Sequence, residues 1–103
     1  MSDAVLLLCT AGTRDEAETI ARALIEEKLA ACVQLSGIES WYRWEGAVEH
    51  SPEWRLHIKT APLLARTVEA RIKTLHSYDL PEIVALPIEG SADYLRWIGE
   101  SVG

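Results

Sequence analysis

The chain has 103 residues, of which 49% are hydrophobic and 25% are charged. It is long enough for one hydrophobic core and too short for two ordinary domains, so we expect a single domain over residues 1–103. Sixteen acidic and ten basic residues give a net charge of -6, which argues against binding to nucleic acid or anionic membranes. The longest apolar run, residues 4–9, is far shorter than the roughly 20 residues that span a bilayer. The N-terminus also lacks the positive charge of a secretory signal, so we expect a soluble cytoplasmic protein.

The first third of the chain predicts a strand followed by a helix. Residues 4–10 (AVLLLCT) form a short, mainly apolar segment without alternation, which is typical of a strand covered on both faces. Thr13 and Glu16 have the spacing of a capping box, in which Thr13 accepts from the Glu16 amide and the Glu16 carboxylate reaches back. Apolar residues then recur at helical spacing over about residues 14–29. The glutamates of this helix, Glu16 and Glu27 among them, are interpreted as solvated charge.

The middle of the chain predicts strands. Residues 31–35 form a second strand, with a bend or bulge at Ser36 and Gly37, either within it or just after it. Residues 38–60 are rich in aromatic and β-branched types and end in strict apolar–polar alternation, so they predict a long hairpin. Pro52 is expected to interrupt the returning arm of this hairpin.

The last part of the chain completes a known arrangement. Residues 62–76 repeat apolar side chains at helical spacing, residues 82–86 form a fourth strand ended by Pro87, and Ser91 can cap a short last helix. This order predicts an α+β protein. We expect a ferredoxin-like β-α-β-β-α-β sandwich with a long central hairpin and a short C-terminal helix, in which both main helices cover one face of a four-stranded antiparallel sheet.

Two cysteines, Cys9 and Cys32, are candidates for chemistry. In the expected sheet they lie about 15–20 Å apart along the strands and about 10 Å apart across one intervening strand. A disulfide needs much closer α-carbons, so an intrachain bridge is not expected. Each thiol is either a small buried hydrophobic group or a metal ligand.

His76 follows the last apolar position of the second predicted helix. It either stabilises the C-terminus of that helix or ligates a metal, because imidazole and thiolate together suit copper and zinc. Glu82 is either a further ligand or an edge charge. We expect Cys9 and His76 at opposite ends of the subunit, so that a shared ion would need ligands from two subunits.

Three tryptophans, Trp41, Trp44 and Trp54, lie in the predicted hairpin. Trp41 and Trp44 are three residues apart, so a regular strand turns them to opposite sides. A sheet covered by helices on one face cannot bury both within a monomer. Because aromatic residues are enriched at interface cores, this pattern favours an oligomer.

Several segments resemble the CutA family of divalent-cation tolerance proteins across nearly the whole chain. These are residues 8–10 (LCT), 27–33 (EKLAACV), 42–46 (YRWEG), 76–78 (HSY), 81–83 (PEI) and 93–97 (DYLRW). The resemblance implies a ferredoxin-like subunit in a homotrimer, with each hairpin reaching onto a neighbour. It also implies a non-catalytic protein that binds copper or another divalent cation. The candidate copper ligands it gives are Cys9 and His76, with Cys32 and Glu82 as weaker candidates.

One difference from the family concerns the candidate metal site. The chain has Leu75 and Ser77 where many relatives have histidine and proline, so it has one imidazole fewer beside His76.

Two alternative functions remain beside this interpretation. A trimeric small-molecule sensor, similar to nitrogen-signalling regulators, would bind its ligand in clefts between subunits. Such a sensor needs donors for an anion, and the clustered supply is Arg43, Arg55 and Lys59. A small hydrolase of the acylphosphatase kind is the weakest alternative, because the chain contains no asparagine.

Overall fold

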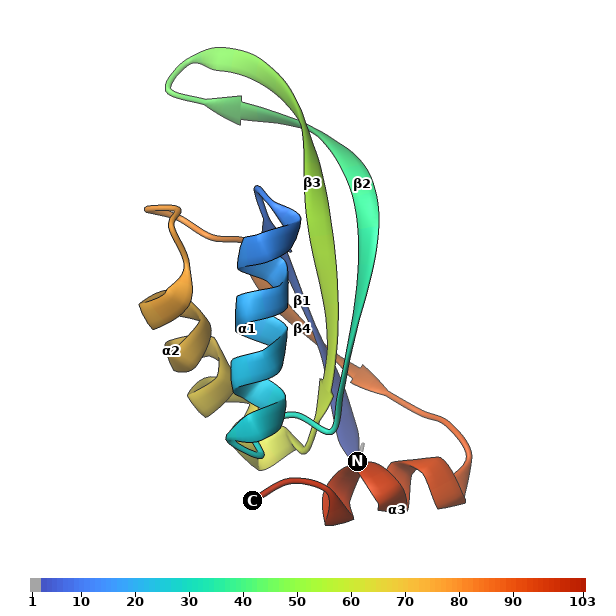
Figure 1. The fold of residues 1–103 in the computed structure, drawn as a ribbon. Coiled ribbons are helices and arrows are strands. Elements are labelled where there is room, and N and C mark those ends of the chain that lie inside the picture. The colour runs from blue at the N-terminus through green and yellow to red at the C-terminus, as the bar shows by residue number, and fades with distance from the viewer. Residues whose placement is uncertain (1–2) are drawn as a thin grey trace.

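Four strands and three helices make up residues 3–103, the part of the chain that the computed structural model describes (Figure 1). They are β1 (Ala4–Ala11), α1 (Arg14–Glu26), β2 (Cys32–Trp44), β3 (Ala47–Thr60), α2 (Ala65–Leu75), β4 (Ile83–Ile88) and α3 (Ala92–Glu100), with a 3-10 turn (Pro62–Leu64) before α2. The strand order is β2-β3-β1-β4, and each neighbouring pair is antiparallel. The predicted α+β, ferredoxin-like architecture is confirmed.

The core lies between the sheet and the two helices α1 and α2, which lie on the same face of it (Figure 1). Successive residues of a strand point to opposite faces, so every second residue of β1 and β3 turns toward the helices. The largest buried side chains of this core are Leu7, Ile20, Leu24, Leu56, Ile58, Val68 and Ile72.

The opposite face of the sheet, which we call the open face, is only partly covered. Tyr94 of α3 lies at one end of it, where its hydroxyl accepts a hydrogen bond from Lys59 Nζ at 3.2 Å. Val84 and Leu86 of β4 also belong to this face and remain 47% and 44% exposed. The open face therefore carries apolar surface that one subunit does not bury. Within residues 3–103, no helix has the length and apolarity needed to cross a membrane.

Two predicted interruptions of strands, one at Ser36 and Gly37 and one at Pro52, are wrong. The strand β2 runs unbroken through Ser36 and Gly37, and Gly37 pairs with Trp54. The strand β3 also continues through Pro52, which pairs with Glu39. The pairing of β3 with β1 ends at Trp54, so at Pro52 β3 has a neighbour on one side only. A proline fits such a position because its missing N–H can face the free side.

Two element boundaries also differ from the prediction. The strand β4 passes through Pro87 and ends at Ile88; β4 is an edge strand, where a missing donor is tolerated. The helix α1 ends at Glu26 instead of near residue 29. The helix ends earlier because Lys28, two residues after Glu26, adopts the left-handed conformation with φ 59°.

The register corrects the spacing of the two cysteines. Cys9 and Leu35 both pair with Leu56, and Cys32 lies three residues before Leu35 in β2. Three residues span about 10 Å along a strand, less than the 15–20 Å expected from sequence. Because three is an odd number, Cys9 faces the helices and Cys32 belongs to the open face. Both thiols are free.

A truncation in the core gives the first test. Ile58 is fully buried, so Ile58→Ala should lower the free energy of unfolding by about 2–5 kcal/mol through lost burial and a residual cavity. Leu63→Ala on the turn before α2 is the control, because Leu63 is 94% exposed and such surface changes cost about 0.5 kcal/mol or less. Urea unfolding followed by circular dichroism, at one protein concentration, measures both. Equal losses would contradict this placement of the core.

Candidate functional site

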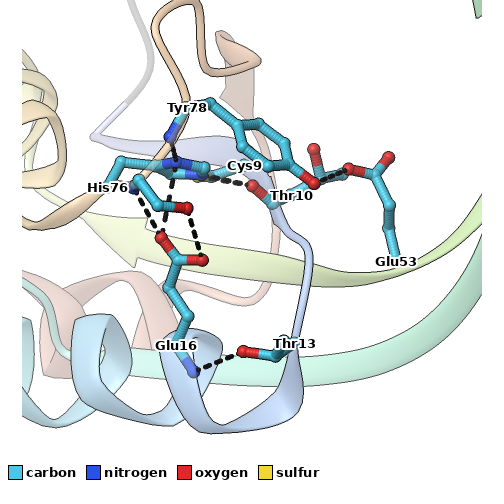
Figure 2. Close-up of polar contacts among 8 residues, drawn as sticks. Cys9, Thr10, Thr13, Glu16, Glu53, His76 and Tyr78 are labelled. Carbon is cyan, nitrogen blue, oxygen red and sulfur yellow. Dashed lines mark hydrogen bonds and ion pairs between the residues drawn. The ribbon is translucent and has the colours of Figure 1, made fainter.

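The segment that joins α2 to β4, residues 76–82, is held at the end of the sheet by hydrogen bonds; we call it the connector (Figure 2). The side chain of His76 is fully buried. Its Nδ1 accepts a hydrogen bond from the Tyr78 amide at 3.0 Å, so the proton is on Nε2, which donates to the Thr10 carbonyl at 2.6 Å. The ring is therefore neutral, and neither nitrogen has a free lone pair for a metal ion.

Glu16, at the start of α1, binds the connector from the other side. The Ser77 amide and hydroxyl donate to the two oxygens of the Glu16 carboxylate at 2.7 and 3.0 Å. Thr13 Oγ1 accepts from the Glu16 amide at 3.1 Å, so that half of the predicted capping box is confirmed. The prediction for the carboxylate is wrong, because Glu16 neither reaches back to Thr13 nor lies free in solvent.

Tyr78 connects the same segment to β3. Its hydroxyl donates to Glu53 Oε2 at 2.9 Å, and Glu53 is only 8% exposed (Figure 2). Burial and this carboxylate raise the pKa of Tyr78, so the phenol keeps its proton and remains a donor. A Cβ on Gly12 would lie 2.9 Å from the Tyr78 oxygen. Glycine therefore lets the ring approach the turn after β1.

Cys9 and His76 lie at the same end of the subunit, so the predicted separation is wrong. The hydrogen bond from His76 to Thr10 brings the end of α2 to the residue that follows Cys9 (Figure 2). The chain direction explains this result. Because β3 is antiparallel to β1 and leads into α2, the helix α2 returns along the sheet in the direction of β1 (Figure 1).

The thiol of Cys9 is buried among core side chains and is 0% exposed. Its hydrogen-bond contact is to the Thr10 carbonyl at 3.7 Å. Burial, with smaller contributions from Glu82, Glu16 and Glu53, raises the pKa of Cys9 to about 12. At neutral pH the thiol is therefore protonated, whereas a metal ligand or nucleophile requires the thiolate.

The four predicted ligands do not form one site within a subunit. Cys32 is partly buried on the open face, across the sheet from Cys9. Glu82 Oε2 lies 3.7 Å from Arg55 Nη2, and the His76 nitrogens are engaged. No three His, Cys, Asp or Glu side chains within residues 3–103 are placed to hold one ion. The donor set of a single subunit therefore does not fit a copper site.

The hairpin tryptophans divide into two kinds. Trp41 and Trp44 are 71% and 41% exposed, and the Trp41 ring stacks on His50 with centroids 3.9 Å apart. Trp54 instead packs against the core, with the Arg14 guanidinium 5.3 Å from the centre of its ring. Only the first two remain available to a neighbouring molecule.

The β2–β3 hairpin curves past the end of the sheet (Figure 1). Side chains of the hairpin and of the connector line a cleft of about 1130 Å³, which we call the hairpin cleft. Residues 38–44 line one side and residues 78–82 the other, with Thr10, Glu53 and Arg55 between them. The sequence interpretation missed Thr10, Glu53 and Tyr78. The one signal for Glu53 was its place on the polar side of an alternating strand, which equally describes a solvated residue.

A double substitution tests the close approach of Tyr78. Gly12→Ala should lower the free energy of unfolding by roughly 1–3 kcal/mol, because the new methyl group meets the Tyr78 hydroxyl. The loss should be smaller when Gly12→Ala is added to Tyr78→Phe, which removes that hydroxyl. Gly99→Ala in α3 is the control, since its Cβ meets nothing within 4 Å. Identical losses in both backgrounds would exclude the contact as the cause.

The burial of Cys9 predicts an alkaline loss of stability. The fold favours the neutral thiol, whose pKa is raised from 9.0 to about 12, so its contribution is complete below about pH 9 and is lost as the pH rises toward 12. Between these values wild-type stability should fall more steeply than that of Cys9→Ala. Tyr78 titrates in both proteins, so the difference isolates the thiol. Cys32→Ala should follow the wild type, and parallel curves for Cys9→Ala would contradict the assignment.

Comparisons with known proteins agree with this fold along nearly the whole chain. The family model described as CutA1 divalent ion tolerance protein matches residues 5–101. A relative from Thermus thermophilus, named divalent-cation tolerance protein CutA, is 46% identical over 100 residues, covering 95% of this chain and 97% of that protein. A relative of the same name from Archaeoglobus fulgidus is 44% identical over 94 residues, covering 90% and 92%.

Solved structures give the same result. One described as the periplasmic divalent cation tolerance protein CutA from Archaeoglobus fulgidus has a TM-score of 0.94 at 40% identity, covering 97% of this chain and 99% of that one. The structure of the Thermus thermophilus protein has a TM-score of 0.93 at 45% identity, with the same coverage. The chain belongs to the CutA1 family of divalent ion tolerance proteins.

Proposed function

We propose that this protein is a homotrimeric divalent-cation tolerance protein that binds copper or another divalent cation and has no catalytic turnover. The relatives from Thermus thermophilus and Archaeoglobus fulgidus carry the tolerance name. The observation that supports the assembly most directly is the projecting hairpin. Beyond Trp54 the arms of β2 and β3 pair only with each other, and Trp41 and Val48 there are 71% and 65% exposed.

The shape of the subunit favours association through this hairpin. The molecule measures 44 × 24 × 21 Å, and the hairpin extends past the end of β1 (Figure 1). An isolated two-stranded ribbon is at best marginally stable in water, so exposed aromatic groups on it favour a covering partner. The apolar residues of the open face, Val84 and Leu86, add a second surface next to the edge strand β4. Hairpin and edge-strand contacts with further copies would cover both.

A bound cation would lie between subunits. Cys9 and His76 are buried and engaged inside the subunit, which leaves Cys32 and Glu82 as the predicted ligands nearer the surface. These two belong to different ends of the sheet, so each could complete a site only with donors of another copy. The net charge of -6 favours the approach of cations.

We infer a cytoplasmic location, because both cysteines are free, as expected in a reducing compartment. Two relatives carry other locations in their names, chloroplastic for an Arabidopsis thaliana protein and periplasmic for the Archaeoglobus fulgidus structure. Fractionation of the native host, with detection by antibody, distinguishes these compartments. Recovery with the periplasmic or membrane fraction would contradict a cytoplasmic location.

Native mass spectrometry tests the assembly. The wild type should appear as a trimer, and Trp41→Glu should shift it toward monomer because a charge replaces an exposed hairpin aromatic. Leu63→Glu is the matched control, because Leu63 is 94% exposed on the turn before α2. It should remain trimeric. A monomeric wild type, or a trimer insensitive to Trp41→Glu, would contradict the proposed interface.

The same measurement with added Cu(II), Cu(I) and Zn(II) tests the cation. Copper should bind to the trimer, and Cys32→Ala or Glu82→Gln should reduce the number of ions bound. Cys9→Ala should leave that number unchanged, because its thiol is buried and protonated. A trimer that binds no metal would overturn cation binding. If Cys9→Ala were the only variant to lose copper, the metal site would lie inside the subunit, and a site between subunits would be wrong.

A further inference from the structure

We propose that, in the homotrimer, Glu49 on the hairpin of one copy pairs with Arg55 on the open face of the next copy. This inference rests on the proposed homotrimer and adds the contact that sets how the copies fit together. Three observations support it: a row of basic side chains on the open face, a buried guanidinium nitrogen without an acceptor, and an exposed carboxylate on the projecting hairpin.

The strand β3 carries a row of basic side chains, which we call the basic row. Its members, Arg55, His57 and Lys59, alternate with the buried core residues Leu56 and Ile58, so all three belong to the open face. Each copy of the chain has a net charge of -6, so copies repel one another unless positive groups on one meet negative groups on the next. The basic row gives the open face the positive groups for such a contact.

Arg55 is the member of the basic row that lacks an acceptor. Within residues 3–103 its Nε is buried without a hydrogen-bond partner, and its ionic contact from Nη2 to Glu82 Oε2, at 3.7 Å, is longer than a hydrogen bond. The side chain is 34% exposed in the subunit, and a second copy on the open face would take water away from it. An unpaired buried donor is costly, and an unpaired buried charge more so. The surface that covers Arg55 must therefore bring an acceptor.

The projecting hairpin carries a carboxylate that suits this need. Glu49 is exposed, and none of the ion pairs found within residues 3–103 includes it, whereas Glu39 on the opposite arm is engaged by His50 at 2.7 Å. Glu49 and Arg55 are six residues apart on β3, an even number, so both side chains belong to the same face of the strand. Six residues span about 20 Å along a strand, so the two cannot pair within one subunit.

The shape of the subunit brings such groups of different copies together. The hairpin extends past the end of β1, and beyond Trp54 its arms pair only with each other (Figure 1). Its open-face side can therefore lie on the sheet of a second copy. A contact that joins two different places on the chain is head-to-tail, and such contacts close into rings, including rings of three. A carboxylate also fits the fork of a guanidinium with two parallel hydrogen bonds, which gives the contact a defined geometry.

Subunit exchange between unlabelled and isotope-labelled trimers, followed by native mass spectrometry, tests this pairing. Loss of one partner of a buried interfacial charge pair mainly speeds dissociation, so Glu49→Gln and Arg55→Gln should each speed exchange by roughly tenfold or more. The double variant should exchange about as fast as either single variant, because the same pair is broken once. Glu45→Gln is the matched control, since it removes the same charge from the turn of the hairpin; it should change the rate by less than about twofold.

Charge reversal gives the converse test. Arg55→Glu and Glu49→Arg should each weaken the trimer alone, and the two together should restore it, because the pair is rebuilt with its charges exchanged. Additive effects in the double glutamine variant, or no rescue by the double reversal, would overturn the pairing and leave the trimer itself in place. If Arg55→Gln speeds exchange and Glu49→Gln does not, another group pairs with Arg55 and the proposal is wrong. A monomeric wild type would overturn both the pairing and the proposed homotrimer.

Discussion

The imidazole of His76 is the contact on which this end of the molecule depends. It links the end of β1 to the connector, because the ring donates a hydrogen bond to the Thr10 carbonyl and accepts one from the Tyr78 amide. The ring is fully buried, and removing it would leave both the Thr10 carbonyl and the Tyr78 amide without this partner. The position of Tyr78, its bond to Glu53 and one wall of the hairpin cleft all follow from this one side chain.

This role restricts the metal chemistry that the subunit can perform. An imidazole that uses both nitrogens for hydrogen bonds must break one of them before it can ligate an ion. A thiol with a pKa of about 12 must also lose a proton that the fold favours. Each requirement subtracts from metal affinity. The interior pair Cys9 and His76 is thus built for packing and positioning, and ligands at the surface carry no such cost.

The fold was largely predictable because apolar periodicity records which face of each element is buried. The two helices, the hairpin and the order of strands follow from it. Local breaks were less predictable, since Gly37 and Pro52 disrupt a strand only where both sides must pair. The position of His76 after the last apolar residue of the second helix marked it as a candidate, and the family resemblance pointed to the same residue. It did not show whether the ring serves a metal or a carbonyl, because that depends on where α2 ends relative to β1.

The candidate site was less predictable for a related reason. Glu16 and Glu53 lie in patterns that describe solvated charge, on a helix N-terminus and on the polar side of a strand. Their burial comes from the connector, which is more than 20 residues away from either in the sequence. Sequence periodicity shows which face of a single helix or strand is buried. It does not show which distant segments of the chain contact each other. The pairing of Glu16 with Ser77 is a tertiary contact of this kind.

The strand β2 is a 13-residue edge without proline, and within residues 3–103 the backbone groups along one of its sides have no partner strand. Such an edge pairs readily with any extended chain. If assembly covers it, the stability of the fold becomes a function of protein concentration, because mass action favours the associated form. Dilution would then do more than separate subunits. It would uncover a template for aggregation, so the abundance of the protein in the cell would itself protect the folded state.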